Sequence, residues 1–95
     1  MPTVAMPITG VILETATTVT TTATTIPATA LTNRRTILVY NNGSVTVFLG
    51  SSTVTTANGV PLAPAAEKNL ELDDGVVLYG RVASGTADVR SLEGA

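Results

Sequence analysis

The sequence contains no cysteine and no histidine. These two absences exclude disulfide bonds, thiol nucleophiles, zinc sites built from Cys and His, and every catalytic arrangement that needs an imidazole. Aromatic residues make up only 3% of the 95 residues, and charged residues only 13%. A hydrophobic core must therefore be aliphatic, and most of the surface must be uncharged.

Charge and long apolar runs are also scarce. Five basic and seven acidic residues give a net charge of −2, and the basic residues are scattered. A nucleic-acid-binding protein needs a basic stripe to neutralise phosphates, so we expect no nucleic-acid partner. No apolar run approaches the roughly 18 residues of a transmembrane helix, and the first residues do not resemble a signal peptide, so we expect no membrane association. Neither a GxGxxG nor a P-loop motif occurs, and we expect no cofactor.

Threonine is the strongest bias, with 18 residues, eight of which fall within residues 15–25. Threonine is β-branched and favours strands over helices, so part of this segment is predicted to form a strand. Two other interpretations remain open. The segment could be a low-complexity linker, because only Val19 could anchor it to a core, or an arm that becomes ordered against a neighbouring molecule.

A short apolar run at residues 11–14 could form a strand, and from residue 26 onward strand-like runs are separated by Gly, Asn, Asp and Ser. We expect strands over residues 11–14, 35–40, 45–49, 53–56, 68–72, 76–82 and 87–90. Two prolines restrict residues 60–64 to an edge segment or a loop, and no window has a helical period with caps. The pattern predicts an all-β fold, a small antiparallel β-sandwich or barrel. Its body spans residues 26–95, and residues 1–25 form an extended Thr/Pro-rich N-terminal arm, part of which could be a strand.

Two details of this prediction concern the C-terminal half. The run 76–82 is largely apolar on both faces, which indicates a strand that is buried on both sides or that lies against another subunit. Leu92 lies beyond the last alternating run, and we expect it to reach the core.

Few residues suggest catalysis or metal binding. Asp73 and Asp74 could ligate a hard cation, but a position before Gly75 favours a turn. Nothing in the sequence brings two of the glutamates together across a cleft, as a glycosidase would need. We therefore expect a protein that is not an enzyme and holds no metal.

Docking residues are easier to find than catalytic ones. Arg34 and Arg35 form the only adjacent basic pair, which is either a partner contact or a solvated strand entrance. The only aromatics, Tyr40, Phe48 and Tyr79, lie on predicted strands, and we expect them in the core or at a subunit interface. A small β domain without disulfides or metal is marginally stable alone, which favours an oligomer.

A resemblance rests on turns and strands between Leu31 and Glu93. The residues that carry it are the segments 35–43 (RTILVYNNG), 47–50 (VFLG), 54–64 (VTTANGVPLAP), 78–80 (LYG) and 84–90 (SGTADVR). In these segments the chain resembles small β-rich accessory proteins of tailed-bacteriophage virions. That family often has Pro-Gly before its Leu-x-Leu strand, whereas Ala65 and Ala66 stand here.

The resemblance implies a capsid decoration, or cement, protein that bridges neighbouring capsomers on the virion exterior after assembly in the bacterial cytoplasm. It implies the major capsid protein as partner and a homotrimer, since threefold capsid positions offer three equivalent docking surfaces. A tail, fibre or baseplate component, or an exposed receptor- or carbohydrate-binding module, is the alternative. The residues expected at the capsid are Pro2, Thr3, Val4, Met6, Pro7, Ile8, Arg34 and Arg35, together with the Thr-rich segment, and those expected between subunits are Tyr40, Phe48 and Tyr79.

Overall fold

Two four-stranded antiparallel sheets make up the computed structural model, which describes residues 10–95. Sheet A has the order β1-β8-β3-β6 and sheet B the order β2-β7-β4-β5. The strands are β1 (Ile12–Val19), β2 (Thr24–Thr25), β3 (Thr36–Asn41), β4 (Val47–Gly50), β5 (Val60–Leu62), β6 (Glu67–Leu70), β7 (Tyr79–Val82) and β8 (Ala87–Gly94). The all-β prediction is confirmed. Residues 1–9 of the predicted arm lie outside the described residues.

The strands follow from alternation in the sequence. In β3, Ile37 and Val39 are buried while their neighbours are only half-buried, and in β4 the same holds for Val47 and Leu49. Successive side chains of a strand point to opposite faces, so these residues turn inward and fill the space between the sheets. The core is aliphatic, as expected, and consists of Val19, Ile26, Ile37, Val39, Val47, Leu49, Leu62, Leu78, Val82, Ala87 and Val89.

The Thr-rich segment belongs to the two sheets. β1 pairs with β8 over its whole length, from Ile12 opposite Gly94 to Val19 opposite Ala87. Farther on, β2 pairs with β7 in sheet B. Val19, the one anchor that the sequence offered here, is fully buried. Residues 12–19 and 24–25, which we grouped with the arm, are therefore strands of the β body.

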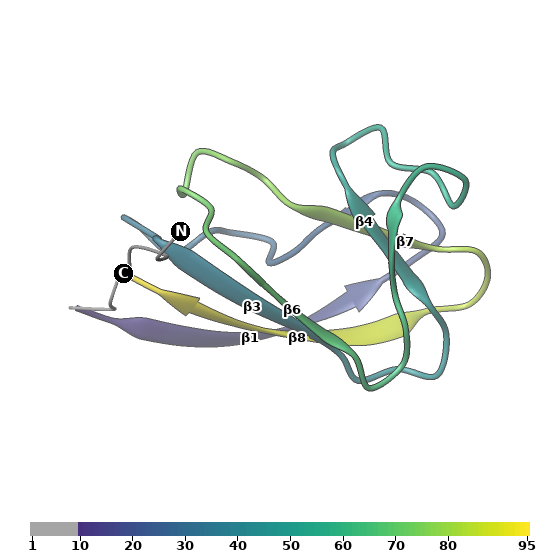
Figure 1. Ribbon diagram of the computed structural model, residues 1–95, viewed down its shortest axis with the longest axis horizontal. Coiled ribbons are helices and arrows are strands. Elements are labelled where there is room, and N and C mark those ends of the chain that lie inside the picture. Colours follow the sequence, from purple (N-terminus) through teal and green to yellow (C-terminus); the bar gives the residue numbers. More distant parts are fainter. Residues whose placement is uncertain (1–9) are drawn as a thin grey trace, which may run out of the picture.

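Figure 1 shows how the sheets are arranged. β1, β8 and β3 run together along the longest dimension of the molecule, with β1 at one border of sheet A. The short strands β4 and β7 lie over one half of this sheet. The chain between β6 and β7 passes over the other half, where no strand of sheet B extends. This loop-covered half contains the polar site described below.

The strand expected at 53–56 is absent, and that prediction is wrong. The segment 51–59 forms consecutive turns, in which the Val54 N–H donates to the Ser51 carbonyl and the Thr55 N–H donates to Asn58 Oδ1. Short Ser, Thr and Asn side chains offer the backbone local partners that compete with strand pairing. Val54 is buried and anchors the turns.

Two further expectations near the C-terminus are also wrong. β7 begins only at Tyr79, and Val76 and Val77 are exposed in the loop before it, which Arg34 holds by donating to the Val76 carbonyl. Leu92 does not reach the core. β8 continues to Gly94 without a bulge, so Leu92 falls on the outer face of sheet A and is 40% exposed.

Candidate functional site

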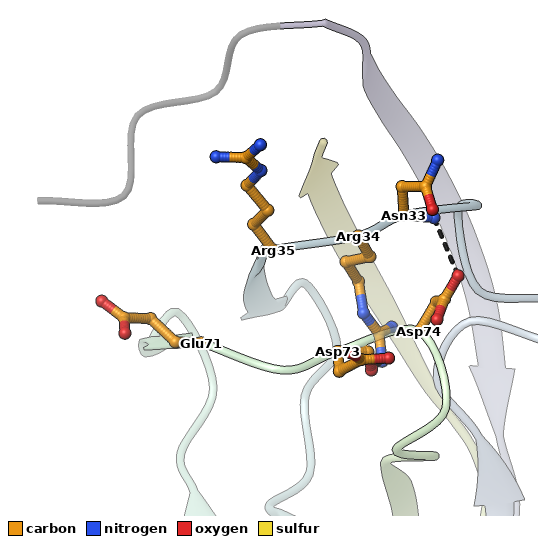
Figure 2. Close-up of a pocket in the computed structure, with 6 residues that line it drawn as sticks. All are labelled: Asn33, Arg34, Arg35, Glu71, Asp73 and Asp74. Atoms are coloured by element: carbon orange, nitrogen blue, oxygen red, sulfur yellow. Dashed lines mark hydrogen bonds between the residues drawn. The ribbon is translucent and has the colours of Figure 1, made fainter.

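An open polar depression of about 570 Å³ lies at the loop-covered half of the sandwich. Its lining combines charges of both signs, as Figure 2 shows, and consists of Asn33, Arg34, Arg35, Glu71, Asp73 and Asp74. Four of the seven acidic side chains of the sequence gather near this end of the fold: Glu71, Asp73, Asp74 and, beneath the surface, Glu93. The depression is therefore the candidate for a catalytic or binding site.

The Arg34 side chain is directed into the protein, and its charge is paired there. Its side chain is 1% exposed, and its Nη1 donates to Glu93 Oε2 at 2.9 Å. Nε donates to the Leu72 carbonyl at 3.1 Å, and Nη2 donates to the carbonyls of Asp73 at 2.9 Å and Val76 at 2.6 Å. The guanidinium therefore fastens the loop 72–76 to the end of β8.

Glu93 completes this arrangement from the inner face of sheet A. Its carboxylate is fully buried, and Oε2 also accepts the Leu31 N–H at 3.0 Å. Oε1 has no hydrogen-bond partner among the described residues. A buried carboxylate is tolerated only when it is paired and hydrogen-bonded, so the pair with Arg34 is what allows Glu93 to sit in the core.

The acidic side chains of the loop accept hydrogen bonds from backbone N–H groups. Asp73 Oδ1 accepts the Gly75 N–H at 2.8 Å, and Asp74 Oδ2 accepts the Asn33 N–H at 2.8 Å. The Gly75 hydrogen bond, followed by a hydrogen bond with Asp74, holds the pKa of Asp73 below its ordinary value of 3.8. Residues 10–95 contain no group of three Asp, Glu, His or Cys side chains that could hold a metal ion. Asp73 thus acts as a turn residue, whereas Asp74 connects the loop to the segment before β3.

Arg35 and Glu71 are exposed side chains of this site. Figure 2 shows both side chains directed away from the buried guanidinium of Arg34. Arg35 is exposed, as a partner contact would require, whereas Arg34 is committed to the interior. The two adjacent arginines therefore have separate structural roles.

A second polar group is buried at the other end of β3. The side-chain amide of Asn41 donates to the carbonyls of Val45 at 2.8 Å and Leu62 at 2.9 Å, while its Oδ1 accepts the Gly43 N–H at 2.9 Å. Sequence analysis ended the predicted strand at residue 40, just before Asn41, and missed both this role and the role of Glu93. No pattern in the sequence distinguishes these two residues from exposed Asn and Glu.

The three aromatic side chains lie on opposite sides of the molecule. Tyr40 is out of phase with the buried Val39 and so faces outward from sheet A. Phe48 lies opposite Arg81, and Tyr79 opposite Gly50, on the outer face of sheet B. All three are half-buried. The three side chains do not form one surface patch, and their place at a subunit interface stays a prediction.

The outer face of sheet A carries apolar side chains beside the charged Glu14 and Arg90, a grouping that sequence analysis did not find. Leu92 lies directly opposite Leu38 in the β3–β8 register, and Ile12 and Tyr40 share this outer face. Ile12 is 56% exposed, and Val11, just before β1, is 57% exposed. We name this surface the outer strip and define it by Ile12, Leu38, Tyr40 and Leu92.

The described residues contain no helix that could cross a bilayer. The chain matches no protein-family model, no curated protein and no solved structure.

Proposed function

We propose that this protein is a non-enzymatic structural component of a phage virion, and that it decorates the capsid and stabilises it by bridging neighbouring capsomers. The observation that carries the proposal is the outer strip, an apolar surface on a body whose buried charges are internally paired. Apolar side chains gathered on one face are typical of protein contact surfaces.

The resemblance of residues 31–93 to small virion β-modules gives the proposal its partner, the major capsid protein. The compact aliphatic core and the tied loop 72–76 are compatible with a role that needs rigidity and surface contact. A trimer would multiply each weak contact with the capsid, because binding of one subunit holds the other two near their sites. The trimer is part of this proposal.

Among the residues expected at the capsid, Arg35 is the one that the geometry keeps in the proposal. It is exposed, whereas Arg34 is buried in its ion pair. The Thr-rich segment, which contributes β1 and β2, and Pro2, Thr3, Val4, Met6, Pro7 and Ile8, which lie outside the described residues, remain a prediction. Deleting residues 2–9 is expected to weaken capsid binding while the β body stays folded.

The test is cosedimentation of the purified protein with empty shells assembled from the major capsid protein of the same phage. Leu92→Lys places a charge in the outer strip and is expected to weaken binding to shells by at least about tenfold. Ala83→Lys, at an exposed position in the loop between β7 and β8, is the matched control and should bind normally.

Two results would overturn the proposal. Wild-type protein that does not bind shells but binds purified tails would favour the tail, fibre or baseplate alternative. Binding to host cells or to their surface carbohydrate, with none to shells, would favour a receptor-binding module.

A further inference from the structure

The four sheet edges of this protein differ in how they are protected against pairing with another strand. In sheet B, β2 has only two residues, and β5 has three, including Pro61. In sheet A, β6 carries Glu67 and Lys68. Short strands, prolines and charged side chains are the devices by which proteins prevent edge-to-edge pairing.

Within residues 10–95, β1 has none of these devices along most of its length. It is eight residues long, contains no proline and no lysine, and pairs with β8 in an unbroken register without a bulge. Glu14 is its only charged residue. The exposed side chains of Val11, Ile12 and Leu13 lie at its start.

Backbone hydrogen bonds show which residues of β1 face the open edge. The carbonyls of Asp88 and Gly94, both even-numbered, accept hydrogen bonds on the β3 side of β8. The N–H of the odd-numbered Ala95 instead donates to the Val11 carbonyl on the β1 side. Alternate residues of an antiparallel strand bond to opposite neighbours, so the odd-numbered residues of β1 bond to β8. The N–H and C=O groups of Ile12, Glu14, Ala16 and Thr18 therefore point away from β8, toward the free edge of sheet A.

We propose that the open edge of β1 pairs with β1 of a second copy of this chain, antiparallel and about a twofold axis, which joins two copies of sheet A into one continuous sheet. The contact goes beyond capsid binding and does not depend on it. If the protein is a trimer, the same contact joins two trimers.

Symmetry and charge select the register. A twofold axis perpendicular to the sheet preserves its faces, so only residues on the same face can lie opposite one another. If the axis passes between the Glu14 residues of the two copies, two like charges lie directly opposite one another, which is unfavourable. Centring it on Thr15 places Glu14 opposite Ala16, Ile12 opposite Thr18 and Leu13 opposite Thr17. This register covers the apolar start of the strand with β-branched residues, so a second copy is the occupant that the edge fits.

The first test is the mass of the purified protein as its concentration rises, measured by analytical ultracentrifugation. We expect the wild-type mass to double relative to that of Ala16→Pro. The Ala16 N–H points to the open edge, so proline there removes a donor needed for the second copy without removing a β1–β8 hydrogen bond. The dissociation constant should rise by at least about tenfold, with an unchanged circular dichroism spectrum.

The second test uses the absence of cysteine from the chain. Thr15 lies on the proposed axis as a non-hydrogen-bonded pair with its own copy, where Cα atoms are about 4.5 Å apart and a disulfide can form. Thr15→Cys should therefore oxidise to a disulfide-linked dimer faster than Thr18→Cys, whose partner in this register is Ile12. This comparison decides the matter if Ala16→Pro does not fold.

Equal wild-type and Ala16→Pro masses at every concentration would overturn the proposal, and so would equal oxidation rates of the two cysteine variants. Loss of shell binding by folded Ala16→Pro, without any doubling of the wild-type mass, would assign the edge to a capsid strand instead of a second copy. Doubling of mass without binding to shells would support the edge contact and contradict capsid decoration.

Discussion

Arg34 and Glu93 form an ion pair of 2.9 Å inside the sandwich, although 59 residues separate them in the chain. The pair connects the segment before β3 to the end of β8, and the other donors of Arg34 bind the loop before β7. Three parts of the chain therefore depend on one guanidinium.

Removing one member of this pair should be strongly destabilising. Arg34→Met leaves the Glu93 carboxylate buried without its counter-charge, and we expect the free energy of unfolding to fall by about 3–5 kcal/mol. Arg34→Met combined with Glu93→Leu should cost less than the sum of the two single changes, because no buried charge remains. Urea denaturation of the three variants measures this coupling.

Arg35→Met is the matched control for this experiment. Arg35 is exposed, and its replacement should change stability by no more than about 0.5 kcal/mol. Equal effects of Arg34→Met and Arg35→Met would contradict the role assigned to the buried pair.

Asn41 should be the most sensitive amide of the chain. Asn41→Ala leaves the Val45 and Leu62 carbonyls without their side-chain donor, and an unsatisfied buried polar group costs about 1–3 kcal/mol. Asn42→Ala, at an exposed neighbour, should have a much smaller effect. Thermal unfolding of the two variants compares them, and an equal loss from both would show that the buried hydrogen bonds of Asn41 contribute little.

Gly80 marks a close approach between β7 and the core. A Cβ at this position would lie 2.6 Å from Ile26 Cδ1 and 3.1 Å from Val47 Cγ1. Because Ile26 is buried in the core cluster, a shift of its Cδ1 would disturb core packing, and Gly80→Ala should lower the free energy of unfolding by about 1–3 kcal/mol.

Two variants check the cause of this loss. Ile26→Val removes the clashing Cδ1 atom, so it should be less harmful in the Gly80→Ala background than in the wild type. Gly75→Ala, whose Cβ would meet nothing closer than Asp73 Oδ1 at 3.5 Å, should be tolerated. Additive effects of Gly80→Ala and Ile26→Val would refute the clash.

Two surface aspartates should make the fold sensitive to acid. Hydrogen bonds from Arg90 and then Asn42 hold the pKa of Asp88 below 3.8, and the Gly75 N–H does the same for the pKa of Asp73. A carboxyl whose pKa is lower in the folded state stabilises the protein fully above its unfolded pKa. That contribution is lost as the pH falls through the folded pKa, so stability should decrease between about pH 5 and pH 2.

Carboxyl titration by NMR measures both groups directly. In Arg90→Ala the pKa of Asp88 should rise toward its ordinary value, because its largest stabilising hydrogen bond is removed, while the pKa of Asp73 should not move. An Asp88 midpoint that is the same with and without Arg90 would contradict this assignment.

Much of the fold could be predicted because its signals are local. Alternation in 35–40 and 45–49, and the Asn-Gly and Ser-Gly turns that follow strands, are properties of neighbouring residues, and β3 and β4 appear where they indicate. The same reasoning failed at 53–56 and 76–78, where hydrogen bonds within the turns and with Arg34 override strand preference. Leu92 was misplaced because its face depends on how far β8 extends.

The sequence by itself determined an aliphatic, all-β protein without thiol or imidazole chemistry, since composition and two-residue alternation do not depend on distant contacts. Only the tertiary structure decided that Arg34 is buried while Arg35 is exposed, that Glu93 is the partner of Arg34, and that β1 is an edge strand of sheet A. Each of these properties depends on which segments meet across the sandwich. Such pairings join residues far apart in the chain, and no local pattern records them.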